Sequence, residues 1–246
     1  MLMKIKKILN KFGYDVIKYH PIYETTIKPL GIKTIIDIGA NEGCFAKEMR
    51  RMFPDAFIYS FEPLQNCYKT LASTMTGDAN FKAYNVALGE NKGIVDMQKS
   101  SFHPSSSMLT MTNLHKSLYP KSKYISIERI KIERLDKIFE NEECKEKIMI
   151  KIDVQGFEDK VILGGKETIK KAAVAIIETS FVELYENQPL FSDINQLMQN
   201  LGFSYYGDLH KHYSSITGKL IYEDSIFINK ILLIIFWYSL LNLSLV

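Results

Sequence analysis

The sequence is poor in the residues that mark several common classes of protein. It has three cysteines in 246 residues, Cys44, Cys67 and Cys144, and no two of them form a CxxC pair. This spacing argues against a disulfide scaffold or a zinc ribbon, and it fits a reducing compartment. The formal net charge is only +3, which is too small to indicate nucleic-acid binding by itself.

The start of the chain lacks the features of a secretory signal. Lys4, Lys6, Lys7 and Lys11 are scattered among its apolar residues, so there is no uninterrupted apolar core, and no small-residue cleavage site follows. We predict a short basic amphipathic helix here. Two alternatives stay open for it: packing on the domain with its lysines in water, and contact with a membrane surface.

Charge is absent from the other end, residues 231–246. As a helix these residues would span roughly 24 Å, which is short of a hydrocarbon core of about 30 Å. A monotopic anchor, a marginal span, a partner-binding helix and a tail folded on its own domain all stay open.

Between these ends, short apolar runs alternate with helical patterns. Alternation in units of this length indicates parallel strands joined by right-handed crossovers, although the last two strands look antiparallel. Ser192 is the predicted cap of the last helix and Gly202 its stop. The predicted strands are 32–39, 56–63, 81–89, 147–154, 172–180, 203–209 and 224–230, and the predicted helices are 44–53, 65–75, 135–140, 157–165 and 191–202.

Residues 93–132 interrupt this rhythm. Apolar runs at 93–97 and 124–132 flank a serine-rich loop at 99–113, which predicts a small antiparallel insertion. We find no internal repeat and no linker. We therefore predict one α/β domain at 31–230, with a basic helical extension at 1–30 and an apolar tail at 231–246.

The stretch 37–45, "DIGANEGCF", is typical of a ligand-binding turn between the first strand and its helix. Gly39 and Gly43 do not have the spacing of G-x-G-x-x-G, and the glycine that would let the backbone approach a pyrophosphate is missing, so a dinucleotide is disfavoured. No Gly-Lys-Ser/Thr follows for a Walker-type phosphate site. Glu42 at the mouth of the helix would also repel a phosphate. The turn therefore favours a cationic ligand.

S-adenosylmethionine is such a ligand, because it carries a sulfonium and an ammonium. We expect Asp37 to act on its amino-acid part, Gly39 to let the backbone approach it, and Glu62 to accept hydrogen bonds from both ribose hydroxyls. The adenine would rest against the end of the third strand. The predicted cofactor-binding residues are Asp37, Gly39, Ala40, Asn41, Gly43, Glu62, Asn85, Val86 and Ala87.

Seven motifs in order resemble the FkbM-like family of S-adenosylmethionine-dependent methyltransferases over about residues 31–230. They are "DIGANEGCF", "FEP", "NVALGE", "RLDKI", "KIDVQGFE", "GG" and "IIET". The resemblance implies a Rossmann-like class I methyltransferase fold with seven strands, and O-methylation, often of sugars or small metabolites. Members commonly have Glu where Gln155 stands, so we assign no role to Gln155. The loop at Ser106–Met108 resembles the segment that covers the acceptor.

Methyl transfer to a hydroxyl benefits from a positioned base at the carboxyl ends of the strands. Asp153 follows the fourth strand of the main sheet and is our first candidate for base or for orienting the acceptor. Glu158 and Glu178 are further candidates. Clustered oxygen ligands at this rim could hold Mg²⁺, but no ligand spacing demands a metal, so a metal site stays open. Lys151 should alternate away from the surroundings of Asp153, which favours a structural role.

The leading hypothesis is an O-methyltransferase acting on a sugar, a glycan or glycolipid precursor, or a small metabolite. It would work in the cytoplasm, with a lipid-linked acceptor at the membrane face as one option. An RNA or protein methyltransferase ranks lower, because no long basic run or stacking motif is present and no nucleic-acid partner is expected. A non-catalytic module that keeps this fold is a third hypothesis, and a nicotinamide oxidoreductase is a fourth. The sequence does not indicate the oligomeric state.

Overall fold

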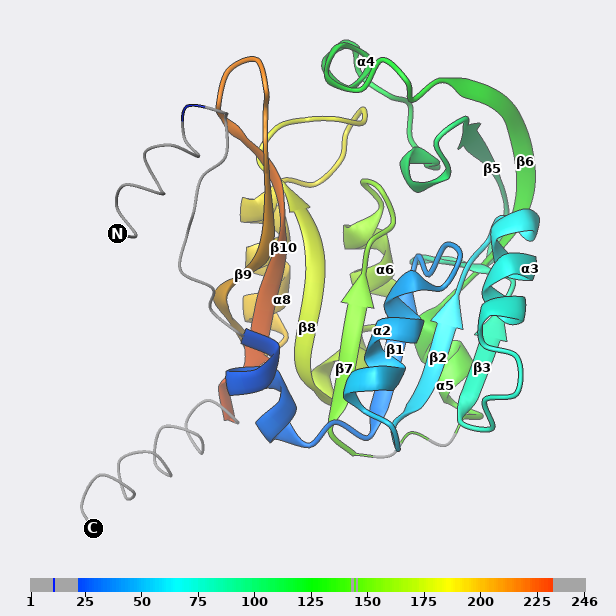
Figure 1. Cartoon of the computed structure of the whole chain (residues 1–246), viewed down its shortest axis with the longest axis vertical. Helices are drawn as coiled ribbons and strands as arrows, with labels where there is room; N and C mark the ends of the chain where they lie inside the picture. Colours follow the sequence, from blue (N-terminus) through cyan, green and yellow to red (C-terminus); the bar gives the residue numbers. More distant parts are fainter. Residues whose placement is uncertain (1–10, 12–21, 143, 145, 232–246) are drawn as a thin grey trace.

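The computed structural model describes residues 11, 22–142, 144 and 146–231, and it is built around a seven-stranded sheet of order β3-β2-β1-β7-β8-β10-β9 (Figure 1). The first five strands of this order are parallel, and β10 is antiparallel to both of its neighbours. The predicted Rossmann-like topology is therefore confirmed. The strands are β1 Thr34–Ile38, β2 Phe57–Phe61, β3 Phe81–Tyr84, β7 Ile148–Ile152, β8 Ala172–Ser180, β9 Phe203–Tyr213 and β10 Leu220–Asn229.

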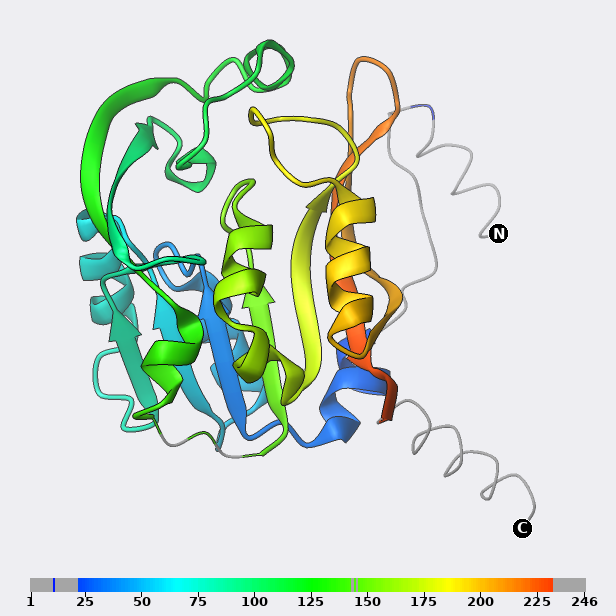
Figure 2. The same cartoon turned by 180° about the vertical axis from the view of Figure 1, so that it is seen from behind.

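Helices cover both faces of the sheet, with α2 on one face and α6 and α8 on the other (Figures 1 and 2). All five predicted helices form, and two short ones, α4 and α7, join them. The helices are α2 Cys44–Met52, α3 Gln65–Thr74, α4 Asn113–Leu118, α5 Leu135–Phe139, α6 Glu158–Gly164, α7 Lys166–Lys170 and α8 Phe191–Asn200.

The core lies on the two faces of this sheet. Every residue of β1 is buried, as expected for a central parallel strand covered on both sides. Ile36 and Ile38 point into the hydrophobic cluster on one face, and Ile35 points into the cluster on the other. Full burial of each such side chain stabilises the folded state by about 1.5–3 kcal/mol. These contacts hold β1 in place in the sheet, so the turn that follows it begins at a fixed position.

A second sheet of three strands stands beside the first, in the order β4-β6-β5. β4 is Ala87–Leu88, β5 is Gly93–Ser100 and β6 is Tyr124–Glu133, and β5 and β6 are antiparallel as predicted. Figure 1 shows β5 and β6 rising beyond the carboxyl ends of β2 and β3. This sheet therefore forms one wall above the strand ends of the main sheet.

The single strand predicted at 81–89 is wrong, because the chain changes sheets in its middle. β3 ends at Tyr84 in the main sheet, and Ala87 already pairs with Ile132 in the second sheet. The Asn85 side chain explains the break: its Nδ2 donates to the carbonyls of Glu62 and Pro63, at 3.0 and 2.8 Å. These bonds bind the chain to the end of β2 and turn it away from the ladder.

The predicted cap of α8 is also wrong. Ser192 lies inside the helix, which begins at Phe191. The Asp193 carboxylate instead accepts from the Leu190 backbone N–H at 2.9 Å. A carboxylate in the first turn suits the positive end of the helix dipole, so Asp193, and not Ser192, supports the start of α8. Gly202 follows the helix at φ +92°, in agreement with its predicted role as the stop.

The predicted basic helix at the start and the apolar tail at 231–246 fall mainly outside the described residues, and the boundaries of the domain stay a prediction. Residues 23–30, which are described, form a π-helical turn and a 3-10 turn. Ile27 in this segment is fully buried in the same cluster as Ile35. None of the helices in the described part of the chain has the length and hydropathy needed to span a bilayer.

Candidate active site

The turn after β1 passes very close to the end of β7. Gly39 has φ +82°, and a Cβ placed on it would lie 1.8 Å from the carbonyl oxygen of Asp153. The N–H groups of Gly39 and Ala40 donate to the Phe61 carbonyl at the end of β2, both at 3.0 Å. Only glycine fits this position, because both the backbone conformation and the space exclude a side chain. The turn thus joins the ends of β1, β2 and β7 in one rim.

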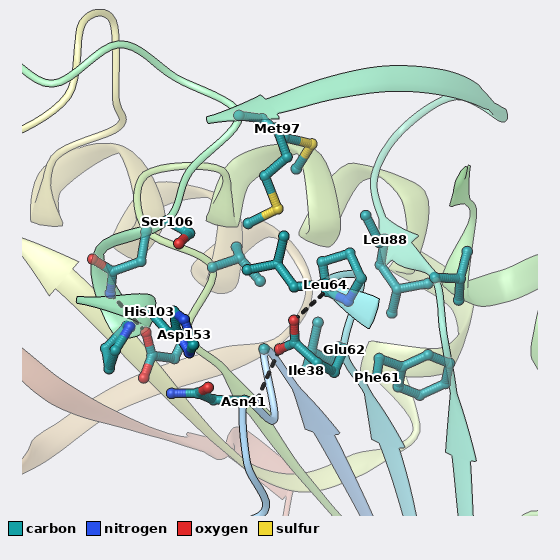
Figure 3. Close-up of a pocket in the computed structure, with 18 residues that line it drawn as sticks. Ile38, Asn41, Phe61, Glu62, Leu64, Leu88, Met97, His103, Ser106 and Asp153 are labelled. Carbon is teal, nitrogen blue, oxygen red and sulfur yellow. Dashed lines mark hydrogen bonds between the residues drawn. The ribbon is translucent and has the colours of Figure 1, made fainter. Parts of the chain in front are cut away.

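Glu62 follows β2 and is held rigidly in this rim. Its two carboxylate oxygens accept from the N–H groups of Asn41 and Leu64, at 2.9 and 2.8 Å (Figure 3). The side chain is 5% exposed, and burial raises its pKa to about 7, although the two backbone hydrogen bonds oppose this rise. A carboxylate oxygen has more than one acceptor site, so Glu62 retains capacity for a ligand.

A pocket of about 660 Å³, including space open to solvent, lies above these strand ends. Its floor is the rim, and its roof comes from the second sheet and from residues 103–108, which we call the covering segment (Figure 3). Six predicted site residues line it: Gly39, Asn41, Glu62, Val86, Ala87 and Asp153. Apolar walls are added by Ile38, Leu64, Leu88, Met97 and Met108.

The remaining predicted cofactor residues lie behind this lining. Asp37 is fully buried: the Ser60 hydroxyl donates to one of its oxygens at 3.4 Å, and Oδ1 has no hydrogen-bond partner among the described residues. Burial raises the Asp37 pKa to about 6, against the opposing effect of Lys151. Asn85 uses its amide on the backbone carbonyls at the end of β2. Ala40 and Gly43 shape the turn. Their roles toward a cofactor stay predictions.

The three predicted catalytic carboxyls gather at the ends of β7 and β8. Asp153 lines the pocket, whereas Glu158 and Glu178 lie behind it. Glu158 is 3% exposed and accepts from the N–H groups of Val154 and Gly156, both at 3.1 Å, which holds the turn before α6. Burial raises the Glu158 pKa to about 7. Its position therefore favours a role in shaping the turn.

Lys151 is the positively charged neighbour of Asp153 in this cluster. Its Nζ lies 2.9 Å from Asp153 Oδ2, and its side chain is 14% exposed. Burial opposes ionisation of Asp153, but the Lys151 ammonium outweighs it and lowers the pKa of Asp153. Burial, with the charges of Asp153 and Glu158, raises the pKa of Glu178 well above its ordinary value. Asp153 is thus the more acidic of the two groups, and Glu178 keeps its proton to a higher pH.

The prediction that Lys151 alternates away from the surroundings of Asp153 is wrong, because its Nζ contacts Asp153 Oδ2. Residues two apart on a strand share a face, so position 151 faces the same side as position 153. The sequence analysis also missed Gln155 and Tyr185. The Gln155 side chain donates to both Asp153 and Glu178. The Tyr185 hydroxyl donates to the Gln155 side chain at 2.8 Å. No local pattern marks these contacts, because Gln155 and Tyr185 are 30 residues apart and meet only in the fold.

The lining of the pocket has a definite chemical character. Its ionisable residues are Glu62, Asp153 and His103, and no lysine or arginine is among them. Glu62 suits neighbouring hydroxyl groups, Asp153 suits an ammonium or a hydroxyl, and the apolar wall suits a flat heterocycle. In the described residues no group of three or more His, Cys, Asp or Glu is arranged to hold a metal ion.

Known methyltransferases are similar in sequence to this chain. A family model described as the Methyltransferase FkbM domain matches residues 37–205. The 2-O-methyltransferase NoeI of Sinorhizobium fredii is 30% identical over 165 residues, which cover 63% of this chain and 66% of NoeI. Methyltransferase sdnD of Sordaria araneosa is 26% identical over 222 residues, which cover 81% of this chain and 84% of sdnD. The chain therefore spans just under two thirds of NoeI.

Among solved structures, the chain is similar to the methyltransferase FkbM of Methylobacillus flagellatus, with a TM-score of 0.47 and 12% identity over 80% of this chain and 44% of that one. No functional conclusion rests on that likeness. The match to the family model covers most of the chain, from the first acid of the turn to the start of β9. The chain belongs to the FkbM family of methyltransferases.

Proposed function

We propose that the chain is an S-adenosylmethionine-dependent O-methyltransferase whose acceptor is a hydroxyl of a sugar, of a glycan or glycolipid precursor, or of a small metabolite. The observation that carries the proposal is the buried Glu62 carboxylate, held by two backbone N–H groups at the floor of a pocket with an apolar wall. The relative NoeI, named a 2-O-methyltransferase, supports oxygen as the acceptor atom.

The residues present fit this cofactor. Its two ribose hydroxyls would donate hydrogen bonds to Glu62, and its amino-acid part would lie over the turn at Gly39. Its adenine would pack against the apolar wall at Leu64, Val86 and Leu88. The side-chain oxygen Oδ1 of Asn41 is buried without a partner in the rim. When bound, the cofactor supplies an electrophilic methyl group. A phosphate-bearing cofactor would instead meet carboxylates and no cationic side chain in the lining.

Asp153 is the residue that would act on the acceptor. Attack by a neutral hydroxyl leaves a strongly acidic proton on the new ether oxygen, so even a carboxylate with a lowered pKa can accept it. Asp153 would orient the acceptor through that hydrogen bond and take the proton as the carbon–oxygen bond forms. The apolar wall and the covering segment would keep water away from the reacting atoms.

Calorimetric titration of the purified protein with S-adenosylmethionine, in parallel with NADH, tests the proposal. We expect saturable binding of S-adenosylmethionine and none of NADH. Absence of S-adenosylmethionine binding by protein that is folded by circular dichroism would reject it. For the acceptor class, cell-envelope glycans and small metabolites of a deletion strain should lack one 14-dalton increment by mass spectrometry, the mass of an added CH₂.

A further inference from the structure

Gln155 has an unusual backbone and a fully engaged side chain. Its φ is +57°, in the left-handed region that non-glycine residues rarely adopt. Its Nε2 donates to Asp153 Oδ1 at 2.9 Å and to Glu178 Oε1 at 2.8 Å, and its Oε1 accepts from the Tyr185 hydroxyl at 2.8 Å. Strained residues persist where their surroundings hold them, and these three bonds are such a constraint.

These partners fix the orientation of the amide. A flipped amide would place its oxygen against the Asp153 carboxylate and would remove the hydrogen bond that Asp153 accepts. The native orientation offers two N–H donors to two acids without bringing a charge of its own. Gln155 is therefore a neutral bridge between the end of β7 and the end of β8.

The same residue is tied to the covering segment. The Ser107 hydroxyl donates to the backbone carbonyl of Gln155 at 2.6 Å. The Tyr185 hydroxyl, which reaches the Gln155 side chain, also lies 3.3 Å from the carbonyl of Ser105. Gln155 thus contacts the roof through its backbone and the acids through its side chain.

We propose that Gln155 is a positioning residue: it holds the Asp153 carboxylate in one orientation toward the pocket and links that orientation to closure of the covering segment. This inference rests on the proposed function, because it gives Asp153 a place in methyl transfer. Gln155 itself need not touch either substrate. Its amide fixes Asp153 Oδ1, and the Lys151 ammonium fixes Oδ2, so neither oxygen is free to rotate away.

The surroundings of Asp153 make a neutral donor important. Carboxyl groups crowd it from several elements, and Lys151 alone offsets them by direct contact among the described residues. Loss of the Gln155 donor would remove a hydrogen bond that favours the ionised form, so the pKa of Asp153 should rise. The titratable groups that face Asp153 or its partners are Asp37 from β1, Lys151 from β7, Glu158 from α6, Glu178 from β8, Tyr185 from the following loop, Tyr222 and Asp224 from β10, and His210 from β9.

The test is a carbon-13 NMR titration of side-chain carboxyls, with the Asp153 signal assigned by its loss in Asp153→Asn. In Gln155→Met we expect the pKa of Asp153 to rise by about 1 or more. Gln196→Met is the matched control, because Gln196 is on α8 and its amide contacts only Asn200 among the bonds described for it. An Asp153 pKa unchanged in Gln155→Met, or raised equally in the control, would overturn the inference.

Amide hydrogen exchange over residues 103–109 provides the second measurement. Both Gln155→Met and Tyr185→Phe should lose protection there by fivefold or more, while the strands of the main sheet keep theirs. If Gln155→Met does not fold, Tyr185→Phe carries the test through the Asp153 pKa, which should rise because Gln155 stays in place but loses the hydroxyl that holds its Oε1. Exchange over residues 103–109 in this variant also reflects loss of the contact with the Ser105 carbonyl, so the Asp153 pKa decides. Lower thermal stability with an unmoved Asp153 pKa would mean a purely structural role and would refute the proposal. All measurements use protein without cofactor, so they are separate from the titration that tests the proposed function.

Discussion

Replacement of Glu62 by Gln tests the proposed cofactor contact most directly. Glu62 accepts from Asn41 and Leu64 with different oxygens, and both ribose hydroxyls of S-adenosylmethionine would add to these bonds. Gln has one acceptor oxygen, so its NH₂ group must face one of the two backbone donors. The variant therefore loses the charge on the ribose contact and disturbs the floor of the pocket.

The size of the effect follows from the bonds lost. A hydrogen bond to a charged group contributes about 1.5–3 kcal/mol. Loss of the equivalent of one such bond would weaken S-adenosylmethionine binding by roughly 10- to 150-fold. Glu128→Gln is the control: Glu128 of β6 accepts from the N–H of Gln65, the first residue of α3, but does not line the pocket. The control should change the dissociation constant less than about twofold, as exposed contacts contribute little.

The pH dependence gives an independent signature of the same carboxyl. Burial raises the Glu62 pKa to about 7 in the free protein. Hydroxyl donors favour the ionised form, so binding lowers this pKa and releases a proton when the pH is below about 7. The affinity of the wild-type protein should thus increase with pH up to about 7 and then level off, being roughly tenfold weaker at pH 6 than at pH 8.

Calorimetry in two buffers of different ionisation enthalpy measures both the affinity for S-adenosylmethionine and the number of protons released on binding. At pH 6.5 the wild-type protein should release a proton to the buffer on binding, and Glu62→Gln should release less. Asp37 and Glu158 titrate in the same range, so the difference between wild type and variant is the informative number. If Glu62→Gln does not fold, Glu62→Asp replaces it in both measurements. Equal affinity and equal proton release in folded wild type and variant would refute the assignment of Glu62 to the ribose.

Three more substitutions or deletions test the same geometry. Asp153→Asn should keep S-adenosylmethionine affinity but lower turnover on the acceptor by about 10²–10⁴-fold, and unchanged turnover would reject its role. Gly39→Ala should abolish cofactor binding or folding, because its Cβ would lie 1.8 Å from a backbone carbonyl oxygen. Gly77→Ala is the control, since Gly77 has a similar φ of +85° but open space around it. In denaturant titrations the control should lower the unfolding free energy by only about 1 kcal/mol. Deletion of residues 231–246 should leave the circular-dichroism spectrum of the domain unchanged. If the tail is an anchor, the deletion should also move the protein from the membrane fraction to the soluble fraction. Loss of folding would show that the tail belongs to the core.

Local patterns were sufficient to predict the frame of the site. The apolar run ending at Asp37, the glycine at 39 and the acid at 62 each lie within a few residues of a strand end, and parallel topology brings such ends to one edge. The structure places Gly39 and Glu62 in one pocket for this reason. The break at Asn85 was not predictable in the same way, because the alternation of residues 81–89 suits a continuous strand and only the carbonyls of a neighbouring strand reveal the turn.

The contacts among charged groups were harder to predict, because they depend on which side chains meet across elements. Two of the three side-chain partners of Gln155 lie on β8 and in the loop after it, and neither is close to Gln155 in sequence. The direction of Lys151, in contrast, was available from the sequence. A period of two places it on the face of Asp153, and the ion pair follows from that rule.

The balance of charge at this rim argues for a cationic ligand. Asp37, Glu62 and Glu158 are buried, and burial raises the pKa of each to about 6 or 7. Such groups hold protons because nearby positive charge is insufficient to keep them ionised, and the ammonium of Lys151 already pairs with Asp153. A ligand with a sulfonium and an ammonium would supply the missing charge and let these carboxyls ionise, so its binding should strengthen as pH rises. A pyrophosphate would add negative charge to the same place and should bind more weakly as pH rises. The sign of the pH dependence of binding therefore separates the two kinds of cofactor without knowledge of the acceptor.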